Sequence, residues 1–401
     1  MENLLYFYLE PYVYLKNSKY GLLLVNLLDD KAFTFEDSES IKIGQLLQDS
    51  PKRTVQITAD DKQTPAIVCA INNFMGDIVS TISQPLQFDS EINNITGHEA
   101  YVRSVGYSKY NIGRYISSCT IFIDMTNRDC SDYIKFTTGV EDSYNKVSCD
   151  VLSKMNVDDI DKYIKELVAI NPDIKLKICG INIALFDYIL SKYPNVSINP
   201  LVSLRTLQLC PEIFNRIKQK QLRYTLLLDL SHDSYDWYIN DKLCSISVKI
   251  DNDSDLEVAN KLLEQGHQIN FCPILTSTNS DFIKSLLSIS HEDLLNIVNK
   301  YRTIKINNLI NSNFWGNLYL FPEGKVCYSL SRAKSFEIQQ LYKRFKTDFL
   351  NGSFDWTLFR NFSKCRDCMF QYLCPSPDYI EIYLRENNQI ECLMFNEKIS
   401  S

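Results

Sequence analysis

The sequence lacks the features that several large classes of protein require. It has only four histidines, no long run of Lys and Arg, and a formal net charge of -7. Because phosphate binding depends on clustered basic side chains, we expect no nucleic-acid partner. No stretch of about 18 apolar residues is present, and the first residues lack a basic leader, so we expect a cytoplasmic protein with no membrane contact. Neither a G-x-x-x-x-G-K-[ST] nor a G-x-G-x-x-G motif occurs, which excludes those two routes to nucleotide binding.

The composition is otherwise that of a globular protein. Hydrophobic residues make up 45% of the 401 residues and charged residues 23%, so a large core can form. A chain of this length exceeds the size of one simple core, and two or three domains are expected.

Cysteine is abundant, with 13 residues. Disulfide scaffolds are short secreted chains, whereas this chain is long and scatters most of its cysteines singly, which indicates reduced thiols. Cys179 and Cys272 lie in apolar runs, where a reduced cysteine packs as a small hydrophobic residue.

The first part of the chain, residues 1–85, predicts a small unit of strands and helices. Apolar runs at 4–15, 20–28 and 31–37 predict strands, and the last two of these predict a hairpin across Asp29 and Asp30. Ser38 is a candidate cap for a short helix, residues 53–58 predict a further strand, and residues 65–79 show helical spacing.

Residues 110–310 alternate between apolar strands and amphipathic helices. This order predicts a parallel sheet, either open or closed as a full or partial barrel, with functional loops at the carboxyl ends of its strands. The loop after the fourth strand contains His232, Asp233 and Asp236, which we interpret as a turn or helix cap rather than a catalytic group. The strand candidates are residues 119–125, 174–180, 195–200, 223–230, 244–250 and 268–275.

Residues 311–401 lose this alternation and contain a cysteine cluster. Cys365, Cys368 and Cys374 have the spacing C-x2-C-x5-C, and Cys392 follows. A two-residue gap lets two thiolates reach the same metal ion or cluster, so the four cysteines are candidate ligands for iron and sulfur or for zinc. The spacing alone does not choose between them, and Cys327 is a possible alternative ligand.

This tail resembles the SPASM domain, the auxiliary iron–sulfur domain of many radical SAM enzymes that modify peptides. The resemblance rests on GKVC, on CRDCMFQYLC and on the later Cys392. It implies one 4Fe-4S cluster on Cys365, Cys368, Cys374 and Cys392. A second auxiliary cluster would need a cysteine where this chain has Asp378.

The catalytic motif of the radical SAM family is missing. That family holds its cofactor-cleaving cluster with C-x3-C-x2-C after the first barrel strand, and this spacing occurs nowhere in the chain. The corresponding loop contains only Cys130. The family's Gly-Gly-Glu segment is reduced to Gly180 in IKLKICGINI, so no S-adenosylmethionine is expected.

The start of the chain resembles the winged-helix element that recognises the leaders of ribosomally made precursor peptides. The resemblance implies a groove between residues 32–35 and the helix around residues 67–74, filled by an extended peptide that adds a strand.

The chain as a whole thus resembles pseudo-radical-SAM proteins with a SPASM domain, of the kind found in peptide-maturation systems of Bacteroidales. The fold expected is α/β: a partial (β/α) barrel of radical-SAM type, an N-terminal winged-helix-like α+β unit and a C-terminal SPASM domain. The implied role is a non-catalytic accessory protein that binds a precursor peptide and an active radical SAM maturase. Two alternatives stay open: a redox enzyme that uses the auxiliary cluster or Cys327, and a zinc-stapled peptide-binding scaffold.

Overall fold

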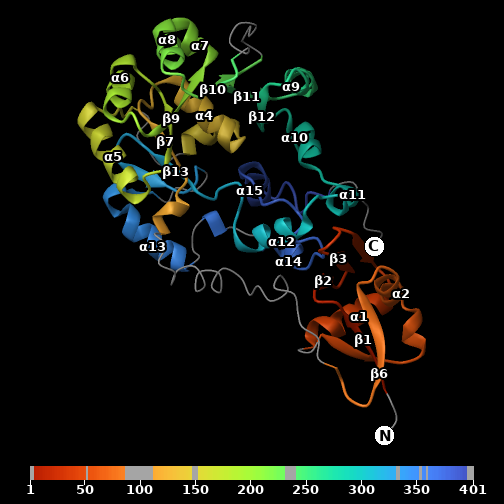
Figure 1. The fold of residues 1–401 in the computed structure, drawn as a ribbon. Coiled ribbons are helices and arrows are strands. Elements are labelled where there is room, and N and C mark those ends of the chain that lie inside the picture. The colour runs from red at the N-terminus through yellow and green to blue at the C-terminus, as the bar shows by residue number, and fades with distance from the viewer. Residues whose placement is uncertain are drawn as a thin grey trace.

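A large, mostly parallel β-sheet dominates the computed structural model (Figure 1). The structure describes residues 4–50, 53–85, 112–146, 152–230, 241–330, 335–351, 355–357 and 360–394. The polar loop with His232, Asp233 and Asp236 lies outside these residues. Within them the sheet has the strand order β12-β11-β10-β9-β8-β7-β13-β14-β15.

Six parallel strands, from the edge strand β12 to β7, form the larger part of this sheet and confirm the six strand candidates. They are β7 (Ser118–Phe122), β8 (Lys175–Cys179), β9 (Ser197–Ser203), β10 (Tyr224–Leu228), β11 (Cys244–Ile250) and β12 (Gln268–Pro273). Residues of β7 and β10 are buried along their whole length, as expected for parallel strands covered on both faces. Edge strand β12 is half-exposed, and Cys272 in it is half-buried, packed against the cluster of Phe136, Leu227 and Ile274.

Helices connect these strands in the order that the sequence predicts. They are α4 (Arg128–Thr138), α5 (Val157–Ile170), α6 (Ile183–Lys192), α7 (Leu204–Leu209), α8 (Pro211–Gln219) and α9 (Asp253–Glu264). The start of α5 shows why they form where they do. Asn156 and Asp159 make a reciprocal capping box, and every third or fourth residue after it is buried.

The C-terminal part of the chain extends the same sheet. β13 (Asn317–Leu320) pairs in parallel with β7, and β14 (Lys325–Cys327) and β15 (Phe336–Glu337) follow antiparallel. Phe345, Phe349 and Trp356 of the tail are fully buried and belong to the core of the large sheet.

The N-terminal unit contains two small antiparallel sheets. One has the order β5-β1-β6, from β1 (Leu4–Leu9), β5 (Thr54–Ile57) and β6 (Gly76–Thr81). The other has the order β2-β3-β4, from β2 (Val13–Ser18), β3 (Gly21–Asn26) and β4 (Ala32–Phe35), and confirms the predicted hairpin. Helices α1 (Ser38–Asp49) and α2 (Pro65–Asn72) complete the unit.

Two local predictions in this unit were wrong. The helix predicted over 65–79 ends at Asn72, because Phe74 adopts a left-handed backbone conformation and the following residues pair with β1 as β6. The cap of α1 is Asp37, whose side chain accepts the Ser40 N–H at 2.8 Å, and Ser38 is already the first helical residue.

The remaining helices follow β12 in the chain. They are α10 (Ser280–Leu287), α11 (His291–Leu295), α12 (Lys300–Leu309), α13 (Leu341–Asn351), α14 (Ser363–Arg366) and α15 (Tyr379–Glu386). Figure 1 shows α12, α14 and α15 at the level where the two parts meet. No helix in the described part of the chain is long and apolar enough to pass through a bilayer.

The β2-β3-β4 sheet is covered on both faces. One face packs with α1 and α2 through side chains such as Leu22 and Leu24. The other face packs through Tyr14, Leu23 and Val25 on the segment that follows Cys368. The cysteine-bearing tail is thus part of the support of the N-terminal sheet.

The buried contact on that second face has a measurable contribution to stability. Leu23 is fully buried, and Leu23→Ala should lower the free energy of unfolding by about 2–5 kcal/mol, the usual range for loss of a packed leucine. Leu28, which is 74% exposed, provides the matched control. Urea unfolding should leave Leu28→Ala close to wild type, and equal effects of the two changes would contradict this packing.

Candidate functional site

The loop after β7 is closed by a helix rather than open to a ligand. Asn127 accepts the N–H of Asp129 at 2.9 Å and caps α4, which begins at once. Cys130 therefore sits on the buried side of α4 with no exposed surface, beside Cys179 at the end of β8. Burial raises the pKa of the Cys179 thiol, and contact with the Cys130 thiol raises it further.

Gly180 completes this closed arrangement at the position that the family motif would occupy. Its φ is +73°, and a Cβ there would lie 2.7 Å from Cys130 Sγ and 2.8 Å from the Asp124 carbonyl oxygen. Asn182 then caps α6 by accepting the Leu185 N–H at 3.0 Å. Both strand-to-helix turns are therefore filled by the chain's own atoms.

The carboxylate of Asp129 belongs to the same buried region. Its Oδ1 accepts the Ser203 N–H at 3.2 Å and the Thr206 hydroxyl at 2.9 Å, which fixes α4 against α7. Burial raises the pKa of Asp129, so the carboxylate here acts as a structural acceptor.

The four tail cysteines differ in exposure. Cys365 in α14 and Cys374 are buried, with 6% and 7% exposure, whereas Cys368 and Cys392 are half-buried. Within the described residues, no three Cys, His, Asp or Glu side chains converge closely enough to hold a single metal ion. The sequence prediction that these four cysteines form one ligand set thus stays a prediction, and the donors around them are its best structural support.

The sulfur atoms of Cys365, Cys368 and Cys392 each accept a hydrogen bond. The donor to Cys365 Sγ is Arg385 Nη2, at 3.5 Å. The backbone N–H of Phe370 points at Cys368 Sγ at 3.4 Å, and that of Met394 points at Cys392 Sγ at 3.4 Å. In both cases the donor lies two residues after the cysteine. Hydrogen bonds to ligand sulfurs are characteristic of iron–sulfur sites, where they adjust the cluster's potential.

Each of the four cysteines also has a cation nearby. Lys16 interacts electrostatically with Cys368, Lys364 with Cys392, and Arg360 with both Cys374 and Cys365. Burial raises the pKa of Cys374 to about 12, while Arg360 opposes that shift. Cations placed around buried thiols favour the thiolate, which is the form that binds a metal or a cluster. At Cys365, Cys368 and Cys374 burial is the larger effect, and the pKa of each thiol is raised overall. Four cysteines of this kind are chemically able to hold an inorganic centre when they bind as thiolates.

A buried ion pair fixes one of these cations. Both nitrogens at the end of the Arg360 side chain donate to the Glu381 carboxylate, at 2.6 and 2.7 Å, and Arg360 Nε donates to the Pro375 carbonyl. Arg360 and Glu381 side chains are 3% and 2% exposed. Neither was anticipated from sequence, because the two residues are 21 positions apart and no local pattern links them.

Asp378 has a structural role at the position where a second cluster would need a cysteine. Its carboxylate caps α15 by accepting the Glu381 N–H at 2.8 Å. Cys327 lies in β14 within the core of the large sheet and is 4% exposed. It faces Cys119 and the aromatic side chains of that core, which is the environment of a packing residue.

Strand β4 offers an open sheet edge. It pairs with β3, and no other described strand pairs with its second side. Asn26 N–H donates to the Lys31 carbonyl at 2.8 Å. Because bonded and non-bonded pairs alternate along an antiparallel ladder, the backbone N–H and C=O of Thr34 point away from β3. An extended peptide can pair with these groups.

A cavity lies beside β4, between this strand and the segment that joins α11 to α12. It has a volume of about 450 Å³ and is lined by 30–33 and by 295–298 with Lys300. The predicted groove between β4 and the helix at 67–74 lies on the other face of the strand. The strand itself is as predicted, and the groove on the helix side stays a prediction.

Helix α12 connects this edge to the cysteine segment. At its start, Asp30 accepts the N–H groups of Asn299 and Lys300, both at 2.8 Å. Towards its end, the Asn307 side chain donates to the carbonyls of Tyr372 and Cys374, at 3.0 and 2.9 Å. Sequence reasoning missed both contacts because they join segments far apart in the chain.

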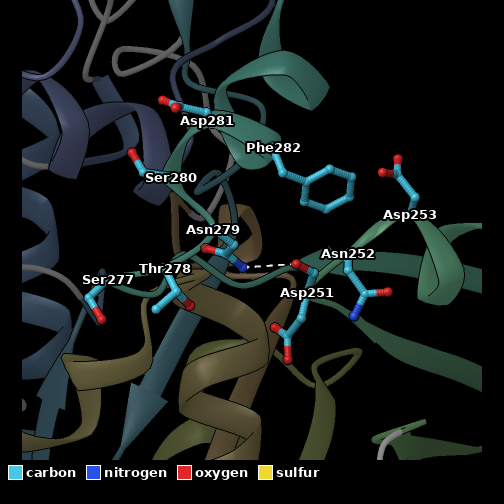
Figure 2. Close-up of a pocket in the computed structure, with 9 residues that line it drawn as sticks. All are labelled: Asp251, Asn252, Asp253, Ser277, Thr278, Asn279, Ser280, Asp281 and Phe282. Atoms are coloured by element: carbon cyan, nitrogen blue, oxygen red, sulfur yellow. Dashed lines mark hydrogen bonds between the residues drawn. The ribbon is translucent and has the colours of Figure 1, made fainter.

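Two polar cavities lie at the carboxyl ends of the parallel strands. The first, of about 340 Å³, is shown in Figure 2, where Asn279 donates to the Asp251 carbonyl at 3.1 Å. Its half-buried Asp251 carboxylate is paired with Lys249 at 2.6 Å. The second cavity, of about 480 Å³, lies between α4 and α7, with Arg128 paired to Asp132 at its rim. The first cavity is lined by three carboxyl side chains and no basic one, whereas the second has two basic and two acidic side chains.

Comparisons with known proteins identify no family for this chain. No protein-family model and no curated protein matches it. Its fold overlaps in part with crystal structures of SuiB from Streptococcus suis, at 12% sequence identity. The structure bound to the precursor peptide SuiA gives a TM-score of 0.38, and the one bound to S-adenosylmethionine gives 0.36; each match covers 94% of this chain and 96% of that chain. At these scores the likeness does not establish what this chain binds.

The closed turn at Gly180 can be tested by adding one methyl group. Gly180→Ala should destabilise the protein by roughly 1–3 kcal/mol, because it combines a positive φ with contacts under 3 Å to Cys130 and Asp124. Gly266 has a φ of +87° but nothing within 4 Å of a Cβ, so Gly266→Ala controls for the backbone cost alone. Thermal unfolding of both variants measures the difference, and equal shifts would show that the space beside Gly180 is open.

Proposed function

We propose that this chain is a non-catalytic accessory protein of ribosomal peptide maturation. It binds an extended precursor peptide along the open edge of β4, and one four-iron four-sulfur cluster orders its tail through Cys365, Cys368, Cys374 and Cys392. When bound, the cluster supplies a covalent inorganic cross-link between distant tail segments and a centre that can accept one electron.

The contrast between the two cysteine regions is the observation that carries the proposal. Cys130, which follows the carboxyl end of β7, is fully buried in the core beside Cys179 and Gly180. The tail cysteines instead have N–H donors and cations around their sulfurs. Burial favours the protonated thiol in both regions, but only the tail cysteines have nearby cations that oppose this effect and would stabilise a bound thiolate.

The peptide-binding part of the proposal rests on β4. Its residues are half-buried throughout, its outer backbone groups face away from β3, and a cavity adjoins it. Main-chain pairing gives such an edge affinity for an extended segment, and the neighbouring pocket gives selectivity for a side chain. Because the chain lacks C-x3-C-x2-C, modification of the peptide needs a separate catalyst, and the proposal includes a radical SAM maturase as that partner.

Of the alternatives, the redox enzyme using Cys327 has the least support. Its thiol is buried in the core of the large sheet, where no substrate reaches it. The zinc-stapled scaffold shares the same four ligands with the proposed cluster, and metal analysis decides between the two.

Metal content tests the cluster directly. Protein purified without oxygen should contain about four iron and four sulfide per chain, with broad visible absorption. Cys368→Ala should lose most of that iron, whereas Cys210→Ala, at an exposed cysteine outside the tail, should retain it. Wild-type protein that contains zinc and no iron would favour the zinc-stapled scaffold and reject the cluster.

Peptide binding can be tested with a change confined to the outer edge of β4. Thr34→Pro removes an N–H that points away from β3, so the β3–β4 ladder keeps its bonds while an added strand loses one. Thr34→Val keeps that N–H and is the matched control.

The probes are fluorescein-labelled peptides that copy the N-terminal halves of short reading frames flanking the gene. Fluorescence anisotropy should show a loss of roughly tenfold or more in affinity for Thr34→Pro, since one hydrogen bond and the strand geometry are lost. Thr34→Val should bind like wild type. Equal binding by all three proteins would reject strand addition at β4.

A further inference from the structure

Arg385, near the end of α15, uses its whole guanidinium group within the tail. Nε donates to Glu381 Oε1 at 2.9 Å, Nη1 to the Glu391 carbonyl at 2.6 Å, and Nη2 to Cys365 Sγ at 3.5 Å. The group also lies over the Phe362 ring, 4.2 Å from its centre. Together these four contacts fix the orientation of the guanidinium group.

These contacts join the two ends of the proposed ligand set. Cys365 is its first cysteine, and Glu391 immediately precedes its last, Cys392. The two cysteines are separated by 26 residues in the chain. Arg385 links their segments directly, beside the ion pair between Lys364 and Glu391, which joins the residues that precede the two cysteines.

The charges around this side chain are buried and closely coupled. Arg360 and Arg385 share one carboxylate, that of Glu381, and the three side chains are 3%, 9% and 2% exposed. The buried Asp378 carboxyl and the thiols of Cys365 and Cys374 also interact electrostatically with Arg360. Because buried charges are costly unless they are paired, an anionic centre on these thiolates would be stabilised by the two guanidinium groups.

We propose that Arg385 is a positioning residue for the cluster, with two separable effects. Its bonds hold Cys365 and the Cys392 segment together, which slows loss of iron. Its positive charge, delivered through a hydrogen bond to Cys365 Sγ, favours the reduced and more negative state of the cluster, which raises the reduction potential. This inference rests on the proposed function, because it requires the four cysteines to hold a cluster.

Two substitutions separate the effects. Arg385→Gln removes both the charge and most of the bonds. Arg385→Lys keeps the charge but cannot reach Glu381, Glu391 and Cys365 together, because an ammonium lacks the planar fork of a guanidinium. Arg302, exposed on α12, gives the matched control Arg302→Gln.

The experiment uses the full chain, purified without oxygen and loaded with its native metal. Iron release to bathophenanthroline should be roughly 10–100-fold faster in both Arg385 variants, the usual effect of losing an outer-shell partner. In titrations with dithionite as the electron donor, Arg385→Gln should change the ratio of reduced to oxidised cluster about tenfold at a fixed potential, a shift of ~59 mV to more negative values. Arg385→Lys should stay close to wild type in potential.

The outcomes distinguish this inference from the function on which it rests. Wild-type protein without iron overturns both. Wild-type protein with a cluster, combined with unchanged release rate and potential in both Arg385 variants, overturns only the positioning role. Circular dichroism of each variant checks the fold, and Arg385→Lys provides the second test if Arg385→Gln does not fold. Arg302→Gln should match wild type in both measurements.

Discussion

The packing of the cysteine-bearing segment on the β2-β3-β4 sheet is the contact on which the rest of the arrangement depends. That sheet has three short strands and buries both faces, one against α1 and α2 and the other against Met369, Phe370 and Leu373. A small sheet needs an apolar face packed on another element for its stability. The tail, together with Leu294 and Ile304, supplies the apolar surface on the second face of β3, the strand that pairs with β4.

The segment that packs on this sheet also contains Cys365, Cys368 and Cys374. The same packing therefore supports the sheet and orders the cysteines. The turn at 365–374 has little regular structure: α14 has four residues, and the next helix begins at Tyr379. Its order comes from side chains of other elements. Gln371 donates to the Arg360 carbonyl at 2.9 Å and accepts from Lys16 Nζ at 3.0 Å, which ties the turn both to the buried ion pair and to β2. Ligands on such a turn are held from both sides before any inorganic centre is present, which lowers the entropy cost of binding one.

Regular features of the fold were predictable from sequence, and contacts between distant segments were not. The six parallel strands follow from short apolar runs such as YTLLL, separated by amphipathic helices. The helix at 65–79 was predicted too long because the apolar residues of β6 continue the spacing of α2, and only pairing with β1 distinguishes them. The cysteine spacing located the candidate site. Its partners could not be found in this way, because Lys16, Arg360 and the α15 pair Glu381 and Arg385 come from three separate segments, and apart from the i,i+4 spacing within α15 no spacing links them.

A physical linkage follows from the position of α12. Its first turn is capped by Asp30, two residues before β4, and its last turn bonds to the carbonyl of Cys374. A ligand that binds only the ordered form of a segment stabilises that form by RT ln(1 + [L]/Kd), about 2.7 kcal/mol at 100 times Kd. Stabilisation of the turn at Cys374 therefore also favours the capped state of α12 and the position of β4. Linkage is reciprocal, so a strand bound along β4 favours the ordered turn by the same free energy. In the proposed function, α12 is the element through which the two sites would be coupled, because it forms hydrogen bonds at both of its ends.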